Sequence, residues 1–89
     1  MLTGRALSRR AAIAAAIPPI LRLHGGSAKV ANLAAEIHQP TRLVRDACLA
    51  LERERWITIA GDQAGTVRLT AKAEATMDEW EAEMAGALR

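Results

Sequence analysis

Two neighbouring stretches in the middle of the chain have the hydrophobic spacing of amphipathic helices. In the first, the apolar side chains at three- and four-residue steps are Val30, Leu33, Ala34 and Ile37. In the second, the same steps are taken by Val44, Ala47, Cys48 and Leu51. The pattern predicts a helix from about residue 29 or 30 to 37, a turn at His38-Gln39, and a helix from about Pro40 to Glu54. Pro40 suits the first helical position because no backbone donor is needed there.

The second half of the chain changes to the alternation that is typical of strands. Residues 56–59 are β-branched or aromatic, residues 61–65 contain two glycines, and residues 66–70 are again rich in β-branched side chains. This order predicts a β-hairpin over residues 56–70. A further helix is predicted over residues 71–88, with Thr70 in position to cap its first turn.

Prolines and glycines divide the N-terminal part. Residues 4–17 are rich in alanine, the residue with the highest helix propensity, and they predict a helix. Pro18-Pro19 is expected to end this helix because proline cannot donate a backbone hydrogen bond. Pro19 would then open a short helix from Ile20 to His24, which Gly25-Gly26 ends. For residues 27–29 two interpretations stay open, an extended segment or the cap of the following helix.

Together these elements predict a single small domain over residues 1–89. The fold class is mainly α with a two-stranded β-element. The composition agrees, because 51% of the residues are hydrophobic while only 2% are aromatic, which suits packed helices. A domain of 89 residues buries a modest fraction of its surface, so association with a second copy would help to stabilise it.

Charge is unevenly distributed along the chain, although the net charge is only +2. Residues 1–72 contain eleven Lys and Arg against five acidic residues, whereas residues 73–89 contain one Arg against five acidic residues. This division indicates one surface for a polyanion and another for a different task. Nucleic acid and an anionic membrane are the obvious polyanions. The alternative is a basic face that is only solvated.

Several classes of site are not indicated. Cys48 is the only cysteine, which excludes an internal disulfide and a multi-cysteine zinc site. On the apolar face of its helix it is expected to act as a small hydrophobe, with a redox switch as the alternative. His24 and His38 have no i, i+4 relation, so we expect no metal site and no cofactor. No nucleophile–base pair or glycine-rich phosphate loop is apparent, so we expect no enzyme activity.

The location expected from the sequence is the cytoplasm. The longest uncharged run, residues 11–21, is too short to cross a bilayer. Ser8-Arg9-Arg10 in front of this run resembles a twin-arginine export signal. Against export, the run is short and no small-x-small cleavage site follows it.

The polar face of the predicted helix 40–54 carries residue types that read DNA. A helix in the major groove needs small or polar residues at its start and Arg or Lys near the base edges. The candidate base-reading residues are Gln39, Thr41, Arg42 and Arg45. The candidate phosphate contacts are Lys29, Arg53, Arg55 and Arg68, joined by Arg5, Arg9 and Arg10 if the first helix lies close to DNA. The alternative is that Arg42 pairs with Asp46 one turn later and only solubilises the helix.

The stretch from Leu33 to Ile57 resembles the helix-turn-helix of winged-helix transcription factors. The matching residues are Leu33-Ala34, Ile37, Val44-Arg45-Asp46-Ala47, Leu51-Glu52 and Trp56-Ile57. Residues 67–80 are similar to the strand and the Leu-Thr opening of the last helix in MarR-type and PadR-type regulators. The resemblance covers about residues 19–80. It implies a winged helix-turn-helix with the helix-turn-helix at about 29–54, a two-stranded β-wing at 56–70, and extra N- and C-terminal helices.

The chain departs from this family pattern at four places. Arg55 and Ala73 stand where glycine is usual, and Cys48 replaces a leucine. The wing tip, residues 62–65, has no Arg or Lys, whereas a basic tip reaches the minor groove in the family. The helix at 40–54 is therefore expected to carry nearly all of the specificity.

The expected function is sequence-specific binding of double-stranded DNA by a homodimeric transcriptional regulator of a bacterium or its phage. The expected dimerisation surface is an apolar stripe on the last helix, formed by Met77, Trp80, Met84 and Leu88. Alternatively, this stripe packs on residues 7–17 of its own chain. The alternative function is a protein–protein adaptor on a winged-helix scaffold, which the lack of Arg and Lys in the wing tip and the low net charge favour. No effector ligand is indicated.

Overall fold

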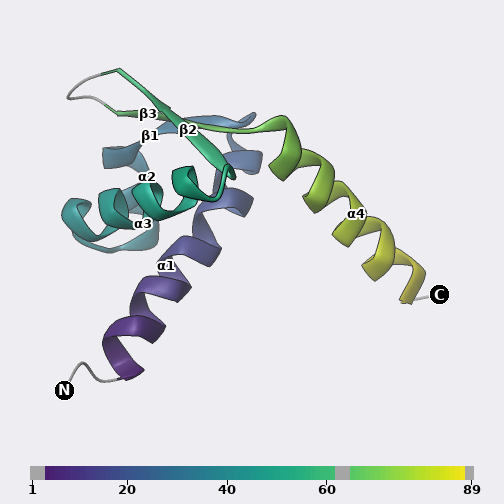
Figure 1. Cartoon of the computed structure of the whole chain (residues 1–89), viewed down its shortest axis with the longest axis horizontal. Coiled ribbons are helices and arrows are strands. Elements are labelled where there is room, and N and C mark those ends of the chain that lie inside the picture. The colour runs from purple at the N-terminus through teal and green to yellow at the C-terminus, as the bar shows by residue number, and fades with distance from the viewer. Residues whose placement is uncertain (1–3, 62–64, 88–89) are drawn as a thin grey trace.

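The computed structural model describes residues 4–61 and 65–87. In chain order its elements are α1 (Gly4–Leu23), β1 (Ser27–Lys29), α2 (Val30–Ile37), α3 (Thr41–Arg53), β2 (Ile57–Ala60), β3 (Thr66–Leu69) and α4 (Ala71–Ala87). The prediction of a mainly helical chain with a small antiparallel sheet is confirmed (Figure 1). Residues 62–64 of the predicted wing tip and Leu88 of the predicted stripe lie outside the described residues.

The predicted β-hairpin is confirmed, because β2 and β3 pair antiparallel. In the part of the chain that the structure describes, a third strand, β1, joins the same sheet, so the predicted number of two strands is wrong. The strand order is β1-β3-β2, and both pairs are antiparallel. Ser27 of β1 and Thr58 of β2 lie opposite Arg68 of the central strand. The extended interpretation of residues 27–29 is therefore the right one.

The third strand forms because its two ends are tied to β3. Gly25 and Gly26 have φ angles of 77° and 98°, a conformation that glycine adopts without steric cost and that turns the chain back after α1. The backbone N–H of Leu69 donates to the Gly26 carbonyl at 2.9 Å, and that of Val30 donates to the Gly65 carbonyl at 3.1 Å. This pairing could not be predicted from the sequence, because residues 27–29 are too few to show a clear alternation of apolar and polar side chains.

α1 is one continuous helix, so the predicted break at Pro18-Pro19 is wrong. Ile13, Ile17 and Leu21 follow four-residue steps across the two prolines, and all three are buried in the core. A proline in a helix interior costs about 3 kcal/mol, while burial of an isoleucine or leucine side chain stabilises by about 1.5–3 kcal/mol. The continuous buried face thus offsets the loss of two backbone hydrogen bonds.

The core lies where α1, α2, α3 and the inner face of the sheet meet. Its largest fully buried side chains are Ile17, Leu21, Leu33, Val44, Cys48, Ile57 and Val67. The inward faces predicted for the two central helices are confirmed, with Ile37 half-buried at the end of α2. α3 begins at Thr41, one residue later than predicted, and the Pro40 carbonyl accepts hydrogen bonds from the N–H groups of Leu43 and Val44.

β2 is an edge strand whose outer side meets α3. The carboxylate of Glu52, on α3, accepts a hydrogen bond from the backbone N–H of Ile59 at 3.0 Å. An unpaired edge N–H is a template for pairing with another strand, and here a side chain of the same chain occupies it.

α4 leaves the sheet through a capped first turn. The Thr70 hydroxyl accepts a hydrogen bond from the Ala73 N–H at 3.1 Å, which confirms the predicted cap. Ala73 and Met77 are buried, whereas the exposed fractions of Trp80 and Met84 are 52% and 66%. Figure 1 shows α4 extending away from α2 and α3 at the right of the molecule. Among the described residues, no helix has the length and apolarity that a membrane span requires.

Candidate nucleic-acid interface

The outer face of α3 is open and basic near its start. Thr41, Arg42 and Arg45 are exposed, as expected from helical spacing. Within the described residues the close contacts between basic and acidic side chains are made by Arg22 and His24, and neither Arg42 nor Arg45 takes part in one. The alternative pairing of Arg42 with Asp46 is therefore not formed. The guanidinium groups of Arg42 and Arg45 can donate hydrogen bonds to another molecule.

The inner face of α3 fixes the direction of that outer face. Val44, Ala47, Cys48 and Leu51 are buried against the core. The turn before α3 is also defined, because His38 adopts a left-handed conformation with φ 59° and ψ 44° and caps α2. A helix anchored at its buried face and its entry turn holds its polar side chains in a reproducible position.

Gln39, a candidate base-reading residue, contacts a basic residue of α1. Its Oε1 accepts hydrogen bonds from Arg9 Nε at 3.0 Å and from Arg9 Nη2 at 2.7 Å. Arg10 lies next to this contact and lines a small hollow together with Arg9, Ile13 and Leu43. α1 thus brings two arginines to the start of α3, which was only a conditional expectation from the sequence.

Two of the candidate phosphate contacts share the outer face of the sheet. Lys29, the last residue of β1, lies opposite Thr66 of β3. Arg68 of β3 lies opposite Ser27 of β1. Both are exposed, and Val67 between Thr66 and Arg68 faces the core. Lys29 and Arg68 therefore form a basic patch on the sheet, distinct from the one on α3.

Arg53 and Arg55 lie at the far end of α3. With a rise of 1.5 Å per residue, Arg53 lies about 16 Å along the helix axis from Arg42. Arg55 follows the helix with φ 64°, a left-handed conformation that favours glycine. The structure therefore distributes the eight candidate DNA contacts over the start of α3, the end of α3 and the sheet.

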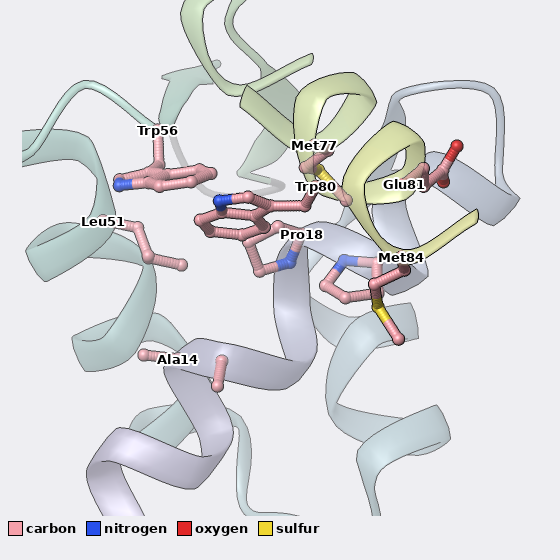
Figure 2. Close-up of a pocket in the computed structure, with 10 residues that line it drawn as sticks. Ala14, Pro18, Leu51, Trp56, Met77, Trp80, Glu81 and Met84 are labelled. Carbon is pink, nitrogen blue, oxygen red and sulfur yellow. The ribbon is translucent and has the colours of Figure 1, made fainter. Parts of the chain in front are cut away.

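An apolar groove separates α1 from α4 (Figure 2). It has a volume of about 440 Å³, and its largest lining side chains are Leu51, Trp56, Met77, Trp80 and Met84. The ring centroids of Trp56 and Trp80 are 5.6 Å apart with an interplanar angle of 34°. Ala14, Ala15, Pro18 and Pro19 form the α1 wall.

The groove decides how the predicted stripe on α4 is used. Met77 is buried against its own chain and Trp80 packs on Trp56. Trp80 and Met84 nevertheless stay largely exposed. Met77 therefore packs within the chain. Trp80 contacts its own chain on one side only, and Trp80 and Met84 keep exposed apolar surface at the groove.

Ionic contacts hold α4 beside the end of α1. Arg22 Nη2 bonds to the Asp78 carboxylate and lies 3.7 Å from a Glu81 carboxylate oxygen. The hydrogen bond with Asp78 raises the pKa of Arg22, and the charges of Asp78, Glu81 and Glu74 act in the same direction against desolvation. Two residues after Arg22, His24 Nε2 contacts the Glu36 carboxylate of α2.

Other chemistry is sparse. Burial raises the pKa of the Cys48 thiol to about 11, so the thiol stays protonated at neutral pH and is a poor nucleophile. Within residues 4–61 and 65–87, no group of three or more His, Cys, Asp or Glu side chains could hold a metal ion. The exposed cations are thus the chemically distinctive groups of this surface.

Two features of the interface were missed at the sequence level. Arg9 and Gln39 are 30 positions apart, and their contact depends on α1 remaining straight enough to reach the start of α3. The second feature is Leu49, for which no role was predicted and which is 43% exposed on the outer side of α3. An apolar side chain among the arginines of α3 suits contact with a thymine methyl group or with an apolar side chain of another protein.

No protein-family model matches the chain, and neither a curated protein nor a solved structure is significantly similar to it.

Proposed function

We propose that this protein binds double-stranded DNA sequence-specifically and regulates transcription as a homodimer in the cytoplasm. In this proposal the chain is a winged helix-turn-helix in which α2 and α3 form the motif and α3 enters the major groove. Gln39, Thr41, Arg42 and Arg45 read base edges. Lys29, Arg53, Arg55 and Arg68 contact phosphates.

The observation that carries the proposal is the outer face of α3. Arg42 and Arg45 are exposed there, free of ion pairs with the other described residues. Arginine donates two parallel hydrogen bonds to guanine O6 and N7, a contact worth about 1–3 kcal/mol of discrimination. A helix that is rigid on its buried side and cationic on its open side supports such a role better than catalysis.

The placement of the sheet supports the winged-helix part of the proposal. The strands β2 and β3 follow α3 directly and carry exposed Arg68, as a wing would. Arg55, at the position where the family usually has glycine, has the left-handed φ of 64° that a glycine would supply. The third strand, β1, adds Lys29 to the same side of the sheet.

The exposed half of the α4 stripe supports the homodimer. Trp80 and Met84 border the apolar groove, and a second copy of α4 would remove them from water. In a two-fold dimer, the recognition helices lie about one DNA turn, ~34 Å, apart.

A salt titration of the binding to random-sequence duplex DNA tests the proposal. Each phosphate contact contributes about −0.9 to the slope of log affinity against log salt concentration. We expect a steep loss of affinity with salt, and Lys29→Ala should reduce the magnitude of the slope by about one. Glu79→Gln, a substitution on exposed α4, is the control and should leave the slope unchanged. Failure of the wild-type chain to retain DNA at low salt would refute the proposal.

Base reading needs a second measurement. A DNA site selected by the wild-type chain from a random pool should be bound by Arg45→Ala with a weaker base preference, by about 1–3 kcal/mol at the contacted position. Lys29→Ala should weaken binding to all sequences alike. An Arg45→Ala chain with the wild-type base preference would exclude Arg45 as a reader.

A protein–protein adaptor is the second candidate function. Exposed Leu49 among the arginines of α3 favours it, as does a wing tip without Arg or Lys at residues 62–65. Absence of DNA binding in the salt titration, together with an intact fold, would favour this function.

A further inference from the structure

The side-chain amide of Gln39 is held on one side by Arg9. Two donors of the same guanidinium group, Nε and Nη2, lie 3.0 and 2.7 Å from Gln39 Oε1. Arginine has donors and no acceptor, so only the amide oxygen can face it. The Nε2 group of the amide, with its two donors, therefore points away from Arg9.

The backbone under this amide is fixed as well. The N–H of Gln39 donates to the Ala34 carbonyl at 3.1 Å, and the left-handed His38 closes the end of α2. The side chain of Gln39 is half-buried. With both the backbone and the amide oxygen bound, rotation of the amide by half a turn would break two charge-assisted hydrogen bonds, which are stronger than neutral ones.

We propose that Arg9 is a positioning residue that makes Gln39 a donor-only reader of bases. The inference rests on the proposed function, because it assigns a base class to a side chain already placed at the DNA surface. A free glutamine recognises adenine with two bonds, since its oxygen accepts from N6 and its nitrogen donates to N7. Arg9 occupies that oxygen, so the two-bond contact with adenine is blocked.

The chemistry of the major groove then decides which bases remain. Guanine presents acceptors at O6 and N7, and thymine presents an acceptor at O4. Cytosine presents only an N4 donor, and adenine places its N6 donor beside N7. A donor-only Gln39 thus favours guanine or thymine over adenine and cytosine at the position it contacts.

The experiment measures base preference at that position. A site is first selected from a random pool by the full wild-type chain, and the position read by Gln39 is found as the one that becomes indifferent in Gln39→Ala. Binding to the four base-pair variants at this position is then compared for the wild type, Arg9→Ala, Arg9→Lys and Arg10→Ala. Arg9→Lys keeps the charge but lacks the planar fork, and Arg10→Ala removes a neighbouring exposed charge without touching Gln39.

We expect Arg9→Ala and Arg9→Lys to change the preferred base to adenine. The affinity for the adenine variant, divided by the affinity for the base that the wild type prefers, should rise at least about fivefold. Arg10→Ala should lower the affinity for all four base-pair variants by the same factor and so leave the base preference unchanged. An unchanged ranking in both Arg9 variants would overturn the inference while leaving DNA binding intact. Failure of the wild-type chain to select any site would instead refute the proposed function.

Discussion

At the scale of single residues, one hydroxyl group joins three elements. Thr70 Oγ1 donates to the Arg55 carbonyl at 2.6 Å and accepts from the Ala73 N–H at 3.1 Å. It thereby connects the end of α3, the end of the sheet and the start of α4. We expect Thr70→Val to lower the free energy of unfolding by about 1–2 kcal/mol, measured by urea denaturation. Thr76→Val is the control, because the Thr76 hydroxyl donates only to the Lys72 carbonyl within α4 and should change stability little.

The role of Thr70 as a cap could be predicted from the sequence, and so could the buried and exposed faces of α3. Both depend on spacing within a few residues, where helix geometry leaves little freedom. The bond from Thr70 to the Arg55 carbonyl and the contact of Arg9 with Gln39 could not be predicted, because each joins residues from different elements whose relative position is set by the whole core.

At the scale of elements, the two prolines of α1 offer a direct test of its continuity. In a continuous helix, Pro19 lacks the N–H that would bond to the Ala15 carbonyl, and its replacement restores that bond. Pro19 is exposed, so Pro19→Ala removes little packing. We expect Pro19→Ala to raise the free energy of unfolding by about 1–3 kcal/mol, measured by urea denaturation. If the helix were broken at Pro18-Pro19, Pro19→Ala would instead lower the free energy of unfolding, because proline restricts the unfolded chain and alanine does not.

The errors at the element scale share a physical cause. Pro18-Pro19 is a strong local signal for a break, and residues 27–29 are a weak local signal for a strand. In both cases tertiary contacts prevail, through the buried series Ile13, Ile17 and Leu21 in α1 and through pairing with β3 for β1. Local patterns report local preferences, and the energy of burial decides between them once the chain is compact.

At the scale of the whole molecule, the proposed dimer predicts that the molecular mass in solution depends on the exposed side chains of α4 at the groove, Trp80 and Met84. Met84 is 66% exposed beside the groove, and a charge there would have to be buried in the dimer. We expect Met84→Glu and Trp80→Glu to convert a dimer into a monomer, measured by light scattering at micromolar concentration.

Leu23→Glu is the matched control for these two variants. Leu23 is also a largely exposed apolar residue, with an exposed fraction of 84%, but it does not line the groove. Its substitution should leave the mass at that of a dimer. A wild-type chain that is monomeric at the same concentration would show that the groove is not closed by a second copy.

The position of the acidic helix also has a consequence for how the protein would meet DNA. The five acidic side chains of α4 are all exposed, whereas Lys and Arg outnumber the acidic residues in residues 1–72. Such a separation is an electric dipole, and the field of a polyanion exerts a torque on it. The molecule would turn its basic side toward DNA while still diffusing, so a larger share of encounters would be productive, and this gain would fall as salt shortens the range of the field.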